Sequence, residues 1–117
     1  MLNEDYSNTS DIPLWVNHKV MEFKSVQELF KWVSDDSENF NLSDYVYDAM
    51  IDCLESKIDR VIVATLIVKD YSEIDVIIRE SNFQEILTSY TKKLLQFERY
   101  ERLNQIKNEI KKYNLAI

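Results

Sequence analysis

The sequence predicts an α+β protein in which about four helices pack on a small, mainly antiparallel sheet. Residues 61–68 form a nearly unbroken β-branched run, which is typical of a central strand. Two segments that begin with serine, 25–28 and 81–84, match the capping box found at helix starts. Apolar residues at helical spacing predict helices at 25–33, 43–57, 82–97 and 99–113.

The first sheet segment, 12–23, is expected to be a short hairpin. Leu14, Trp15 and Val16 form an apolar patch, and Asn17-His18 offers a turn before the chain continues extended. Pro13 fits the beginning or the edge of a strand.

The second sheet segment covers residues 60–79. The central strand at 60–69 is followed by the turn composition of residues 70–73 and by a partner strand at 74–79. With the four expected helices, these two sheet segments give the element order ββ-αα-ββ-αα along the chain.

Serines are the expected N-caps of three helices. Ser25 and Ser81 begin the two capping boxes, and Ser43 precedes the helix at 43–57. The last two helices form a hairpin over 82–113. Its second helix carries a narrow apolar seam, made by Tyr100, Leu103, Ile106, Ile110 and Tyr113.

Length and composition indicate one domain over residues 1–117, with 1–11 flexible. The chain is 45% hydrophobic, which is enough for one core. It has no apolar run of about 18 residues and no secretory signal near its first residue, so we expect no membrane partner. Its one cysteine, Cys53, excludes an internal disulfide, and the default location is the cytoplasm.

No catalytic, metal or cofactor site is recognisable in the sequence. The chain has no glycine, which excludes phosphate loops, the dinucleotide fingerprint and the nucleophile elbow. His18, the single histidine, is expected in a solvated turn, and Cys53 on a buried helix stripe. Asp35 begins an acidic stretch that lacks the glycine and glutamate of a calcium loop. We therefore expect no cofactor and no enzyme.

An acidic row is the best candidate for a protein-binding surface. Its members follow one another at spacings of three or four, and a continuous helix would place them on one face: Asp44, Asp48, Asp52, Glu55 and Asp59. Like charges at this spacing slightly disfavour a helix, so a partner with a basic surface would explain their presence. The alternative is a solvated helix face whose spacing is accidental.

The charge is unevenly placed along the chain. The net charge is −7, but residues 91–113 carry seven basic and three acidic residues. This basic segment could contact phosphates, although its interleaved glutamates favour solvated helix faces. We do not expect nucleic acid to be the partner.

The segment 95–112 resembles the short helical hairpin of the UvrB/UvrC type. The likeness rests on Leu95-Gln96-Phe97-Glu98-Arg99-Tyr100-Glu101-Arg102-Leu103 and the Ile-Lys tail that follows, with Tyr100 and Glu101 where small residues are usual. In that family the hairpin mediates contact between proteins. As a whole, the acidic, glycine-free chain is similar to small early or accessory proteins of T-even-like bacteriophages, which implies a bacteriophage origin and binding to a host enzyme.

Three hypotheses for function follow. The first is a non-enzymatic binding module, encoded by a phage, that modulates a host protein such as RNA polymerase or a defence enzyme through the acidic row. The second is a structural protein that self-associates through the C-terminal seam. The third is a nucleic-acid binder that uses the basic hairpin.

Overall fold

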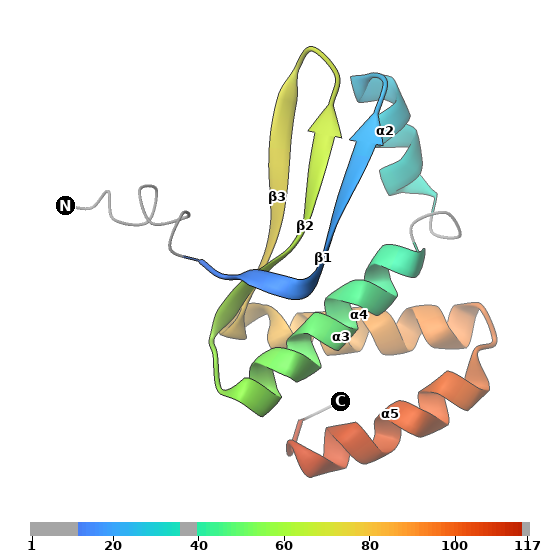
Figure 1. Ribbon diagram of the computed structural model, residues 1–117. Coiled ribbons are helices and arrows are strands. Elements are labelled where there is room, and N and C mark those ends of the chain that lie inside the picture. The colour runs from blue at the N-terminus through green and yellow to red at the C-terminus, as the bar shows by residue number, and fades with distance from the viewer. Residues whose placement is uncertain (1–11, 36–39, 116–117) are drawn as a thin grey trace.

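The computed structural model describes residues 12–35 and 40–115, and the expected flexible segment 1–11 lies outside them. Figure 1 shows the sheet at one end of the molecule, with α3, α4 and α5 gathered at the other end and α2 next to β1. The elements are β1 (Leu14–Phe23), α2 (Val26–Ser34), α3 (Phe40–Ser56), β2 (Arg60–Val68), β3 (Ser72–Arg79), α4 (Phe83–Gln96) and α5 (Tyr100–Lys112).

The α+β class and the C-terminal helical hairpin are confirmed. The sheet has the order β1-β2-β3, and β2 is its central strand, as its run of β-branched residues predicted. β2 pairs with β1 in parallel and with β3 antiparallel, so the sheet is mixed. The parallel pair is possible because α2 and α3 form the crossover between its strands.

The prediction of a hairpin at 12–23 is wrong, because this segment forms the single strand β1. The turn signal of Asn17 and His18 is accommodated by an irregularity in the pairing. Leu14 pairs with Ile62 and Lys19 pairs with Ala64, so five steps along β1 correspond to two along β2. The extra residues bend the strand without reversing it, since pairing with β2 outweighs the local turn preference.

One of the three expected serine caps is confirmed. The Ser25 hydroxyl accepts a hydrogen bond from the Glu28 backbone N–H at 3.1 Å, and α2 begins at the next residue. α3 begins three residues before Ser43, so that serine lies inside the helix. Ser81 lies in a 3₁₀ turn, where Asn82 supplies the capping oxygen by accepting from the Arg79 N–H at 3.2 Å.

Three helices end in left-handed residues although the chain has no glycine. Lys57, Glu98 and Asn114 have φ angles of 61°, 56° and 56°. After each of them, the next backbone N–H donates to a carbonyl five positions back, at 3.0, 2.7 and 2.9 Å. This is the Schellman arrangement, which usually places glycine at the left-handed position.

The apolar core has two parts. The larger cluster joins α3, α4 and α5 to β2 and contains Val63, Leu87 and Ile106, each fully buried. The smaller cluster lies under α2 and contains Phe23, Leu29, Leu66 and Val68. No helix within the described ranges is long and apolar enough to cross a membrane.

The C-terminal seam packs inside the protein. Ile106 and Ile110 belong to the larger cluster, and Leu103 and Tyr113 pack against it. Tyr100 departs from the expected seam, because 54% of it is exposed. The seam is therefore occupied by the chain's own core and offers little apolar surface to a second copy.

Candidate functional site

The five residues of the acidic row do not share one environment. Asp44, Asp48, Asp52 and Glu55 lie on α3, whereas Asp59 follows the end of that helix and precedes β2. Glu55 and Asp59 are exposed, but Asp44 and Asp52 are half-buried. The row is thus divided between the surface and the contacts of α3 with its neighbours.

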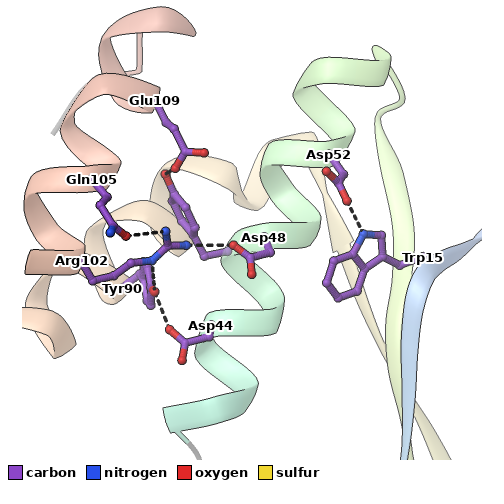
Figure 2. A network of polar contacts seen from close by, with 9 residues as sticks. Trp15, Asp44, Asp48, Asp52, Tyr90, Arg102, Gln105 and Glu109 are labelled. Atoms are coloured by element: carbon purple, nitrogen blue, oxygen red, sulfur yellow. Dashed lines mark hydrogen bonds and ion pairs between the residues drawn. The ribbon is translucent and has the colours of Figure 1, made fainter. Parts of the chain in front are cut away.

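Two of these acids join α3 to the C-terminal hairpin, as Figure 2 shows. Asp48 accepts from Arg102 Nη2 at 2.9 Å, and the Asp48 side chain keeps 52% of its surface exposed. Asp44 accepts from the Tyr90 hydroxyl, whose oxygen in turn accepts from Arg102 Nε at 3.2 Å. Arg102 therefore connects the two carboxylates of α3 directly and through a tyrosine of α4.

A second tyrosine completes this network. Tyr47 stacks on Tyr90 with ring centroids 4.7 Å apart, and its hydroxyl donates to Glu109 of α5 at 2.9 Å. The Arg102 guanidinium lies 5.5 Å from the centre of the Tyr47 ring. Burial, together with the Glu109 contact, raises the pKa of Tyr47 well above its usual value, so the hydroxyl stays protonated.

Asp52 points in another direction, toward the sheet. Its carboxylate accepts from Trp15 Nε1 at 2.6 Å, which attaches α3 to β1 (Figure 2). Three of the five acids thus take part in the fold. Charge reversal at Asp48 or Asp52 would disturb the packing of α3 as well as the surface charge.

An excess of negative charge remains around Asp48. Burial raises the pKa of this carboxylate, Arg102 lowers it, and the like charges of Asp44, Glu109 and Asp52 raise it, with a net upward direction. Burial is the largest of these causes, and the excess of negative charge follows from the number of carboxylates, four near one arginine. Glu109 is an acidic member of this surface that the spacing argument did not find, because it lies on a different helix.

The basic C-terminal segment is partly used inside the fold. Arg102 binds Asp48, and Lys93 Nζ donates to the Ser43 hydroxyl at 2.9 Å. Lys112 lies 5.2 Å from the centre of the neighbouring Tyr113 ring. Asp48 thus offsets the charge of Arg102, and the other two contacts hold Lys93 and Lys112 against groups of the protein itself.

An apolar groove that the sequence did not reveal lies between α2 and α4. It has a volume of about 470 Å³, and its floor includes Leu66 of β2 and Ile78 of β3. Its walls carry apolar side chains that are not fully buried: Trp32, Val33, Leu42, Val46, Ile77 and Ile86. We call this feature the α2–α4 groove.

The rim of the α2–α4 groove is polar. Glu85, Ser89 and Lys93 lie on the groove side of α4, and Ser43 lies across from them on α3. An apolar floor with a few polar groups at the edge is the usual composition of a binding site, and the volume lies in the range of about 300–1,000 Å³ seen for such sites.

Neither sequence nor structure comparison found a match. Scans against protein-family models, curated proteins and solved structures each returned no similar protein.

The chemistry-bearing residues do not converge on one point. His18 Nε2 lies 2.9 Å from the Thr65 hydroxyl oxygen, and that hydroxyl donates to Asp75 at 2.9 Å, so the histidine belongs to the sheet and not to a turn. In the series His18–Thr65–Asp75 the threonine contacts both other residues, whereas in a hydrolytic triad the histidine lies between the hydroxyl and the acid. Among the described residues, no group of three or more His, Cys, Asp or Glu side chains could hold a metal ion.

Proposed function

We propose that this chain is a non-enzymatic module that binds another protein, and that an apolar segment of the partner docks in the α2–α4 groove. The observation that carries the proposal is the six incompletely buried apolar side chains that line one concave surface. Protein interfaces combine such an apolar centre with a polar rim, which Glu85, Ser89 and Lys93 supply.

The test compares two lysine variants with equal exposure in the wild type. Val33 lines the groove and Leu95 lies on α4 outside it, and each is 54% exposed. Wild type, Val33→Lys and Leu95→Lys are immobilised, incubated with bacterial lysate, and their retained proteins are quantified by mass spectrometry. We expect one dominant protein on wild type and Leu95→Lys and at least a tenfold loss on Val33→Lys, about 1.4 kcal/mol.

Two results would contradict a groove-bound partner. One is the retention of the same protein by all three surfaces. The other is its loss from both variants, which would indicate a general effect of added lysine. Circular dichroism of each variant ensures that only folded proteins are compared.

The acidic residues of α3 support a second surface for the same function. Asp44, Asp48, Asp52 and Glu109 lie near a single arginine, Arg102, and this local excess of negative charge would attract a partner with a basic surface and increase its association rate. Glu55 and Asp59 are the two members suited to mutation, since both are exposed and the Asp59 side chain pairs with the adjacent Arg60 side chain at 3.3 Å.

For this surface we expect the double variant Glu55→Lys/Asp59→Lys to slow association about tenfold or more at low salt and to leave dissociation nearly unchanged. The matched control is Glu73→Lys/Glu101→Lys, which makes the same change of net charge at exposed positions outside both the acidic row and the α2–α4 groove. Association rates with the captured partner are measured by surface plasmon resonance. Equal slowing in both double variants would show that net charge, not the α3 surface, controls association.

A further inference from the structure

β1 leaves one of its two edges without a partner strand in the part of the chain that the structure describes. The sheet order places β1 at the edge, and its pairing with β2 is regular over Lys19–Phe23. Proteins commonly protect such edges with proline, bulges or charged residues, because a free edge can pair with another strand. Pro13 and the irregularity between Leu14 and Lys19 protect the first half of β1. In the second half Lys19 lies 4.9 Å from the centre of the Tyr45 ring, and Glu22 is the exposed charged residue.

The backbone of the second half of β1 has a defined orientation. The Phe23 carbonyl accepts from the Lys69 N–H at 3.0 Å and therefore faces β2. Because successive residues of a strand direct their hydrogen-bonding groups to opposite edges, Met21 also faces β2, whereas Val20 and Glu22 direct theirs outward. Val20 is 53% exposed and Glu22 is exposed, so α2 does not cover the side chains of these two residues.

We propose that β1 pairs antiparallel with β1 of a second copy of this chain, around a two-fold axis at Val20, to form a continuous six-stranded sheet. In this register Val20 meets Val20 of the partner subunit, and their outward N–H and C=O groups form both hydrogen bonds of a paired site. His18, whose Nε2 lies 2.9 Å from the Thr65 hydroxyl oxygen, is opposite Glu22 of the partner subunit in this register, and the symmetry repeats the pair. The edge thus brings no like charges opposite one another when it pairs with itself.

The other edge of the sheet has a different charge pattern. β3 carries Glu73, Asp75 and Arg79 on one face of the strand. Antiparallel pairing of two β3 strands around Ile74 would place Glu73 opposite Asp75, which is unfavourable, and pairing around Val76 would place Glu73 opposite Arg79. A dimer through β3 is thus the competing arrangement, and it would be indifferent to a change at Val20. This inference goes beyond the proposed partner of the α2–α4 groove and uses a different surface.

The oligomeric state of the full chain is the first test. Sedimentation velocity between about 1 µM and 1 mM is expected to show a concentration-dependent shift from monomer to dimer. Val20→Lys should weaken dimerisation about tenfold or more, because two like charges then meet at the axis. Val16→Lys is the matched control, since Val16 is 84% exposed on the same strand but outside the paired stretch, and it should leave the dimer unchanged.

A cysteine cross-link tests the register itself. Hydrogen-bonded antiparallel partners have Cα atoms about 5.5 Å apart, within the range of a disulfide. Val20→Cys treated with diamide should give a covalent dimer, whereas Val16→Cys should not, and Cys53 does not compete because it is 1% exposed. A monomer at every concentration, or a dimer indifferent to Val20→Lys, would overturn the proposal. Unlimited growth with concentration would also overturn it, because it indicates β1 pairing with β3 in open chains.

Discussion

At the residue scale, the Tyr90 hydroxyl is a junction between three helices. It lies on α4, donates to Asp44 of α3 and accepts from Arg102 of α5. Burial, followed by the hydrogen bond to Asp44, raises the pKa of Tyr90 to about 12, while Arg102 lowers it. The folded state therefore holds this proton more tightly than the unfolded chain, in which a tyrosine has a pKa of about 10.

This shift gives Tyr90→Phe a distinct pH dependence. At neutral pH the variant should lose about 1–3 kcal/mol of unfolding free energy, because Asp44 and Arg102 lose a shared partner. The wild-type contribution is fully present below about pH 10 and is lost as pH rises through about 12, so the difference between the two proteins should shrink over that interval.

Urea unfolding at about pH 8, 10 and 11.5 measures this convergence. Tyr71→Phe is the control, since Tyr71 is 73% exposed and should behave like the wild type throughout. A constant difference between wild type and Tyr90→Phe across the range would show that ionisation of Tyr90 is not linked to folding.

The network around Tyr90 also shows what sequence reasoning could reach at this scale. Spacing placed Asp44, Asp48 and Asp52 along one helix, and all three lie on α3. It could not tell a solvated row from a contact between elements, because their partners lie 46, 54 and 37 positions away in the chain. A helical pattern determines which residues share a face but not what covers that face.

At the element scale, three helices end in a left-handed residue that is not glycine, and this conformation costs free energy that glycine would not lose. Glu98 ends α4 with φ of 56°, and the Arg99 N–H reaches back to the Leu94 carbonyl at 2.7 Å. A residue with a Cβ atom loses about 1–2 kcal/mol in this left-handed conformation. The turn forms nevertheless, because it directs α5 onto the larger core cluster.

Replacement of Glu98 by glycine should therefore stabilise the protein. The strain removed at residue 98 is partly offset by the greater conformational freedom of glycine in the unfolded chain. We therefore expect the free energy of unfolding to rise by about 0.5 kcal/mol, or Tm by about 2–4 °C. Glu98→Ala removes the same charge but keeps Cβ and should stay close to the wild type. Thermal unfolding followed by circular dichroism separates the two variants, and an equal gain in both would assign the effect to charge.

Local signals predicted the elements unevenly. The capping box at Ser25 correctly located the beginning of α2, because its hydrogen bonds lie within one turn. The turn signal at Asn17 and His18 failed, because β1 is held by β2, more than forty positions away. The α2–α4 groove was out of reach for the same reason, since it exists only where α2, α4 and the sheet meet.

At the scale of the whole molecule, the two core clusters imply unequal stability. Leu29 is the one buried residue of α2, and it belongs to the smaller cluster with Phe23, Leu66 and Val68. α4 buries four residues in the larger cluster, including Leu87 and Leu94. Elements with few buried contacts open at lower free energy than the rest of a protein, so α2, a wall of the α2–α4 groove, is expected to open first.

Hydrogen exchange tests this order of opening. Amides of α2 should exchange through local opening, and those of α4 only through global unfolding. Leu29→Ala should abolish protection in α2 and leave α4 protected. Once α2 has opened, the substitution destabilises nothing further, so the global free energy of unfolding can fall by no more than the free energy of opening α2. Ile106→Ala, at a fully buried position, should instead lower protection in every element, by about 2–5 kcal/mol.

Equal protection of α2 and α4 in the wild type would contradict the division into two clusters. If a partner binds in the α2–α4 groove, its addition should slow amide exchange most in α2, because the partner then packs against the helix with the lowest free energy of opening.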